Sequence, residues 1–126
     1  MRAQREQVFS GLCHAFNAVP LWGLLFNGYI LFTLREESRT VVYHARQAMT
    51  FHALLMLGML IFIALGLVAR LMLILSPSFG DLMRQINMAV AEAALIGYVA
   101  VCVYGAAQCF QGQPFHYPLL GTRKGS

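Results

Sequence analysis

Three long apolar runs, separated by short polar segments, dominate the chain. The first extends over Val8–Leu34 and contains no Asp, Glu, Lys or Arg. The second extends over Gln47–Leu75, and the third over Leu82–Phe110, where only Arg84 and Glu92 interrupt it with charge. A helix needs about 20 apolar residues to cross the hydrocarbon core of a bilayer. Each run therefore predicts one transmembrane helix.

Proline and the polar segments predict where these helices bend and end. Pro20 lies in the middle of the first run, and a proline inside a helix favours a kink. Residues 35–40 are polar and predict a first loop. A helix over residues 41–75 would be about 50 Å long, more than the hydrocarbon core of ~30 Å, so its first turns should lie in the headgroup zone.

The second connection is predicted to be a short loop over Ser76–Arg84, with Asp81 as the N-cap of the third helix. Residues 111–126 form a turn-rich tail. The predicted fold is all-α: one domain, residues 1–126, folded as an integral membrane bundle of three transmembrane helices with an interfacial first loop.

Composition supports a lipid environment. Hydrophobic residues make up 59% of the chain and charged residues 11%, whereas ordinary globular proteins have roughly 25% charged residues. A soluble protein of this size must cover a large surface with polar groups, and disorder requires low hydrophobicity. The composition therefore excludes both a soluble globular protein and an intrinsically disordered one. The net charge of +4 comes from scattered cations, without the basic face of a nucleic-acid-binding protein. The expected partners are membrane lipids and other membrane proteins or a second copy, with no nucleic acid.

Three spans would put the N-terminus and the second loop on one side of the membrane, and the first loop and the C-terminus on the other. Lys and Arg residues are nearly balanced between the two sides: Arg2, Arg5, Arg70 and Arg84 against Arg35, Arg39, Arg46, Arg123 and Lys124. The positive-inside rule therefore gives only a slight preference, for a cytoplasmic first loop and C-terminus.

Three short motifs carry a resemblance to a known family. Residues 12–18 (LCHAFNA), 42–51 (VYHARQAMTF) and 112–119 (GQPFHYPL) resemble, in order, the opening, central and closing motifs of small bacterial membrane proteins related to the chloroplast Tic translocon. This superfamily includes a domain of unknown function and the MamF-type magnetosome membrane proteins. One departure is Arg35-Glu36-Glu37, where the family usually has a Lys-Lys-Asp-type turn.

The resemblance implies a helical protein of the bacterial inner membrane, or of an organelle membrane derived from it, that assembles with other proteins. It also implies that the motif residues contact headgroups or partners: His14, His44, Arg46, Gln47, Tyr117 and Pro118. It does not by itself define a function, because most members of the superfamily are uncharacterised.

Glu92 is the residue whose position is hardest to explain by packing. An acid at the centre of a span costs about 2.5 to 3.5 kcal/mol on translocon scales. Arg70 is a possible partner, since its expected axial offset from Glu92 is only ~7 Å. The two could form a structural intramembrane pair, or Glu92 could belong to a proton or ion path.

The remaining polar residues give no positive sign of catalysis. The four histidines form no i,i+4 pair, so a metal site could form only across helices, and interfacial hydrogen bonding is the favoured interpretation. Cys13, Cys102 and Cys109 lie in apolar runs without CxxC spacing and are expected to pack as small apolar residues. Phosphate-loop, HExxH and GxSxG motifs are absent. We predict no catalytic residue, no cofactor and no metal, and therefore no enzyme.

Small residues on the third run predict helix packing. Ala89, Ala93 and Gly97 recur every four residues, and small residues allow helices in a bilayer to approach closely. This stripe would meet the second helix or a copy of itself. The leading functional hypothesis is a non-enzymatic membrane subunit or assembly and scaffold factor that works through helix–helix contacts. The alternatives are an oligomeric translocation or ion-conducting component using Glu92, and a lipid-modifying enzyme using His44 and Arg46.

Overall fold

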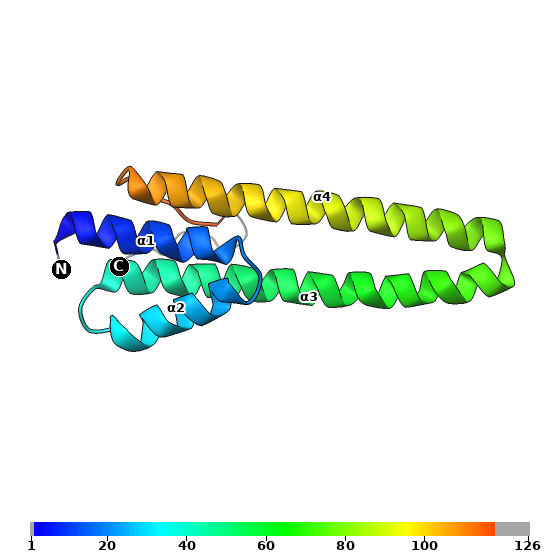
Figure 1. Cartoon of the computed structure of the whole chain (residues 1–126), viewed down its shortest axis with the longest axis horizontal. Coiled ribbons are helices and arrows are strands. Elements are labelled where there is room, and N and C mark those ends of the chain that lie inside the picture. Colours follow the sequence, from blue (N-terminus) through cyan, green and yellow to red (C-terminus); the bar gives the residue numbers. More distant parts are fainter. Residues whose placement is uncertain (1, 118–126) are drawn as a thin grey trace. The chain divides into compact units, whose positions relative to one another are not determined.

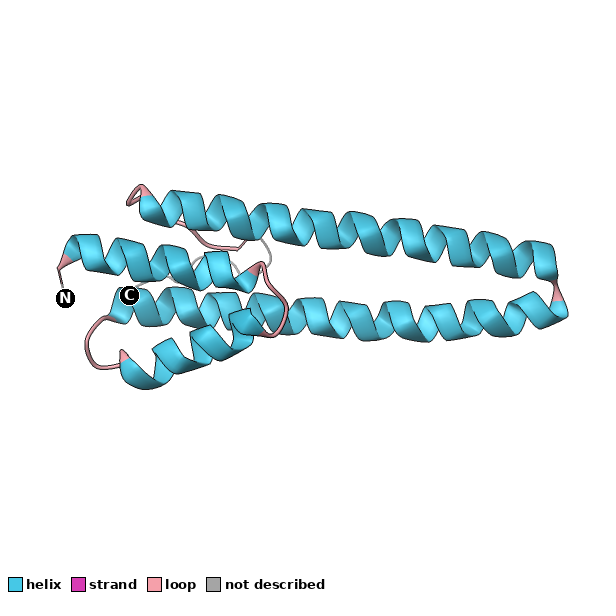
Figure 2. Ribbon diagram, in the orientation of Figure 1, coloured by secondary structure: helices cyan, strands magenta, loops and turns pink. Residues whose placement is uncertain are grey.

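A computed structural model describes residues 2–117, which contain helices and no strands (Figures 1 and 2). The elements are α1 (Ala3–Asn17), α2 (Trp22–Thr33), α3 (Arg39–Leu75) and α4 (Pro77–Phe110). The all-α class predicted from the sequence is confirmed. The chain divides into two compact units, one of residues 1–53 and 99–126 and the other of residues 54–98, and α3 and α4 contribute to both.

Helices α3 and α4 have the length and composition of membrane spans. They contain 37 and 34 residues, well above the roughly 20 that a span requires. Only 6% of the most apolar window of α3 and 11% of that of α4 is buried inside the protein. A core helix of a soluble protein would be mostly buried, so these exposed apolar surfaces fit contact with lipid or with other membrane helices.

The first apolar run does not form the single span that the sequence predicts. Residues 18–21 interrupt it and separate α1, of 15 residues, from α2, of 12. Leu21 has a positive φ of 70°, and the Trp22 N–H donates to the Pro20 carbonyl at 2.9 Å, which is the bonding pattern of a tight γ-turn. The expected kink at Pro20 is thus a complete break, and neither short helix can cross a bilayer alone.

Helices α1 and α2 pack against each other as a helical hairpin (Figure 1). The Asn27 amide donates to the Cys13 carbonyl at 3.1 Å, and the rings of Phe16 and Phe26 stack with their centroids 4.4 Å apart. The hairpin returns the chain to the start of α1, where the Ser38 hydroxyl donates to the Glu6 carboxylate at 2.5 Å. The expected placement of the N-terminus and the first loop at opposite ends is therefore wrong.

The connection between α3 and α4 is also shorter than predicted. Only Ser76 separates the two helices, and Asp81 lies inside α4 rather than at its N-cap. Pro77 is well suited to the first position of a helix, because its missing N–H would have no helical partner there. Gly80 allows the close turn, since a Cβ at this position would overlap the backbone of Met72 and Leu73.

Candidate functional site

The end of α4 positions the C-terminal part of the site. The Gly112 N–H donates to the Cys109 carbonyl at 3.0 Å, and the Gln113 N–H donates to the Gln108 carbonyl at 2.8 Å. Gly112 has a φ of 74°. These two bonds and the left-handed glycine form a Schellman motif, the ordinary glycine-dependent end of a helix. The motif turns the chain back toward α1 and α3, so that Tyr117 becomes completely buried.

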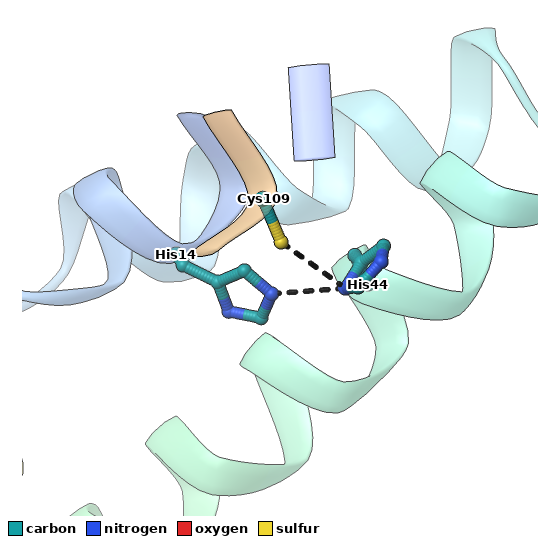
Figure 3. Close-up of side chains that lie close together, drawn as sticks. All are labelled: His14, His44 and Cys109. Atoms are coloured by element: carbon teal, nitrogen blue, oxygen red, sulfur yellow. Dashed lines mark hydrogen bonds between the residues drawn. The ribbon is translucent and has the colours of Figure 1, made fainter. Parts of the chain in front are cut away.

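Four side chains from four segments meet in a buried polar cluster, defined here as His14, His44, Cys109 and Tyr117. His14 Nδ1 lies 2.7 Å from the Tyr117 hydroxyl, and His14 Nε2 lies 3.0 Å from His44 Nδ1. Cys109 Sγ lies 3.8 Å from His44 Nδ1. Figure 3 shows the two imidazoles and the thiol directed toward one another from α1, α3 and α4.

Surrounding groups hold the cluster in place. The Gln47 side-chain oxygen accepts the Tyr117 N–H at 3.2 Å, and the Gln47 amide donates to the Tyr43 hydroxyl at 2.8 Å. The Tyr117 ring stacks on Phe51 with the centroids 4.1 Å apart. The Asn17 amide donates to the Tyr117 hydroxyl at 3.4 Å. Buried polar groups are costly unless they are hydrogen-bonded, and these contacts provide that compensation.

The histidine on α1 is held neutral. His14 belongs to a helix too short to span a membrane, and burial, with the neighbouring His44 adding to the effect, lowers the pKa of His14 to about 3. The imidazole is therefore uncharged at neutral pH, with one ring nitrogen carrying a proton and the other a lone pair.

A cavity of about 480 Å³ reaches the cluster. His44 and Cys109 line it, together with Glu6 and Ser10 of α1. The Ser10 hydroxyl is buried and has no hydrogen-bond partner within residues 2–117. The cavity thus gives small solutes a route to two members of the cluster and to an unsatisfied hydroxyl.

The structure brings together most of the residues that the motif resemblance singles out. His14, His44, Gln47 and Tyr117 all belong to the cluster or bond to it. Arg46 is exposed, and Pro118 lies outside the described residues. The motif residues therefore contact mainly one another rather than forming an exposed face.

The pair expected between Arg70 and Glu92 is not formed. Both side chains are exposed, and the ion pair found in the described part of the chain joins Arg84 to Asp81 at 2.8 Å. The reason is the early start of α4 at Pro77. Glu92 lies about 15 residues into this helix rather than ten, so its axial offset from Arg70 is ~15 Å instead of ~7 Å.

The small-residue stripe of Ala89, Ala93 and Gly97 faces outward. All three are exposed, and a Cβ added at Gly97 would meet nothing within 4 Å. Contact with α3 is made elsewhere on α4, where the Asn87 amide donates to the Phe62 carbonyl at 3.0 Å. The stripe is therefore free to meet another chain.

Sequence reasoning missed Cys109 and Asn17 as members of this site. Asn17 lies three residues after His14, which places both on one face of α1, and this spacing was the available signal. The sequence around Cys109 does not indicate a polar contact, because its apolar neighbours favour simple packing. Its closeness to His44 depends on the path of the chain.

The fold and the cluster define a small all-helical protein with two helices long and apolar enough to span a membrane, and with a polar centre that gathers residues from all three motifs. Comparison with family models identifies the family: residues 5–123 match the magnetosome magnetite crystal formation protein family, and the chain belongs to it. The MamF-type part of the resemblance is thereby confirmed. The comparisons with curated proteins and with solved structures find no match.

Proposed function

We propose that this protein is a non-enzymatic subunit or assembly factor that works inside the membrane through helix–helix contacts. The observation that supports this role most directly is the outward-facing stripe of Ala89, Ala93 and Gly97 on α4. Helices in a bilayer associate by close packing at small residues, because lipid tails are as apolar as the helices themselves. Because these three residues are exposed within residues 2–117, the stripe supports a contact with a second chain.

Family membership supports a magnetosome membrane as the place where this role is carried out. The family is described by magnetite crystal formation in magnetosomes, and our proposal is that this chain acts as a scaffold in such a membrane, derived from the bacterial inner membrane. The wider resemblance to Tic-type translocon proteins fits the same kind of work, namely assembly with other membrane proteins.

A matched pair of substitutions tests the proposal. Ala93→Leu places a large side chain on the stripe, and Ala94→Leu makes the same change at the next exposed position, off the stripe. We expect Ala93→Leu to lower the oligomeric mass in mild detergent or to reduce co-purification with membrane partners, and Ala94→Leu to leave both unchanged. Equal behaviour of the two variants, or a wild-type protein that is monomeric and captures no membrane protein, would reject the scaffold role.

A second candidate is an oligomeric conducting component, and Glu92 is the observation that favours it. This acid is exposed in an apolar part of α4, where an unpaired charge is costly in lipid. In an oligomer it would line a polar path. Ion flux in liposomes that is lost on Glu92→Gln would support this function, whereas absence of flux in the wild-type protein would reject it.

A further inference from the structure

Three ligand atoms of types that bind transition metals converge in the buried polar cluster. The ligand atoms that His14, His44 and Cys109 offer all lie within 4.8 Å of one another, and all three residues are buried. They come from three different helices. We propose that these three side chains bind a thiophilic transition-metal cation, with Zn²⁺ as the closest chemical fit. This site is separate from the proposed scaffold role and does not depend on it.

The kinds of ligand atom in the cluster indicate which metal ions it can bind. Imidazole nitrogen and thiolate sulfur suit Zn²⁺ and Cu⁺, whereas Mg²⁺ and Ca²⁺ prefer oxygen ligands. Zn²⁺ binds nitrogen at about 2.0 to 2.1 Å and sulfur at about 2.3 Å with tetrahedral geometry, which spaces neighbouring ligand atoms roughly 3.3 to 3.6 Å apart. The separations of 3.0 Å between the two imidazole nitrogens and 3.8 Å between nitrogen and sulfur lie on either side of that range.

Tyr117 prepares His14 to act as a ligand. The Tyr117 hydroxyl lies 2.7 Å from His14 Nδ1. When Nδ1 carries the ring proton and donates it to this hydroxyl, Nε2 presents its lone pair toward His44 and Cys109. Metal-binding histidines are commonly oriented in this way, by a hydrogen bond from the second ring nitrogen. The contact therefore fixes the direction of the ring, with Nε2 toward His44.

The cavity beside the cluster supplies access and an open position. His44 and Cys109 line the cavity, so a hydrated cation can reach two ligands directly. Three protein ligands leave a fourth tetrahedral position for water. Ser10 also lines the cavity, and its buried hydroxyl lacks a partner within the described chain, which makes it available to that water. Cys109 binds as the thiolate, and its proton leaves to the buffer as the metal–sulfur bond forms.

The test uses the full-length protein, purified in detergent and freed of metal by a chelator. We expect Co²⁺ to bind at about one ion per chain, to produce a thiolate-to-cobalt charge-transfer absorption, and to be displaced by Zn²⁺ but not by excess Mg²⁺. Cys109→Ser should abolish this absorption. His14→Gln and His44→Gln should each weaken Zn²⁺ binding roughly tenfold or more.

Matched controls remove the same residue types outside the three-ligand set. Cys102→Ser removes another buried cysteine of α4, and His52→Gln removes another buried histidine of α3; both should bind Co²⁺ as the wild-type protein does. Failure of the wild-type protein to bind Co²⁺ or Zn²⁺ stoichiometrically would overturn the proposal, as would unchanged binding in Cys109→Ser.

A measurement on the wild-type protein keeps the proposal testable if the variants do not fold. X-ray absorption at the zinc edge should report one sulfur and two imidazole nitrogens around Zn²⁺. A shell of oxygen and nitrogen alone, or one with more than one sulfur, would place the ion elsewhere and reject this site.

Discussion

At the scale of single residues, polar side chains in the apolar helices fall into two groups. One group is buried and internally satisfied: His14 and Tyr117 bond to each other, and Gln47 bonds to the Tyr117 backbone. The other group is exposed, and two of its members, Arg70 and Glu92, have no ion pair within residues 2–117. Side chains that do not touch should contribute to stability independently.

This independence gives a prediction for Arg70 and Glu92. The effects of Arg70→Ala and Glu92→Ala on the free energy of unfolding should add in the double variant to within about 0.3 to 0.5 kcal/mol, because distant sites without shared partners are additive. Detergent-induced unfolding of the four proteins measures this. A coupling of about 1 kcal/mol or more would mean that the two charges interact after all.

At the scale of elements, apolar patterning predicted most of the helices and missed one break. The predicted ends of the second and third spans, Leu75 and Phe110, are the observed ends of α3 and α4. The break in the first run was missed because the run looks uniformly apolar, and Pro20 alone signals only a kink. A complete break also needed Leu21 in a conformation that non-glycine residues rarely adopt. The start of α4 was misplaced because Pro77 and Asp81 both carry helix-start signals.

The α1–α2 hairpin predicts a membrane topology different from that of three spans. Gln4→Cys and Glu36→Cys place thiols at exposed positions near the start of α1 and in the first loop. The native cysteines are buried, and the variants are made in a Cys109→Ser background because Cys109 lines the cavity, so a membrane-impermeant maleimide should label only the new thiols. We expect labelling of both variants from the same side of the membrane. Labelling from opposite sides would contradict the hairpin topology and would indicate that the first apolar run crosses the membrane.

At the scale of the whole molecule, the motifs are distant in sequence and close in space. His14 and Tyr117 are 103 positions apart, and His14 and His44 are 30 apart. The sequence could single out the motif residues through their resemblance to a family. It could not predict that they touch, because these contacts depend on chain reversals at Pro20, between α2 and α3, at Ser76 and at Gly112. The inclusion of Cys109 depends on the turn at Ser76 between α3 and α4.

The central claim is that these motifs form one energetically coupled cluster, and a double-mutant cycle on His14 and Tyr117 tests it most directly. Tyr117→Phe removes the hydroxyl and His14→Leu removes the ring nitrogens, so each single variant removes the 2.7 Å contact and leaves its buried partner with one hydrogen bond fewer. We expect the double variant to lose less stability than the sum of the two single variants, by about 0.5 to 3 kcal/mol. A parallel cycle of Tyr117→Phe with Thr33→Ala, an exposed position on α2, should be additive. Additivity in the His14 cycle as well would show that His14 and Tyr117 are not energetically coupled.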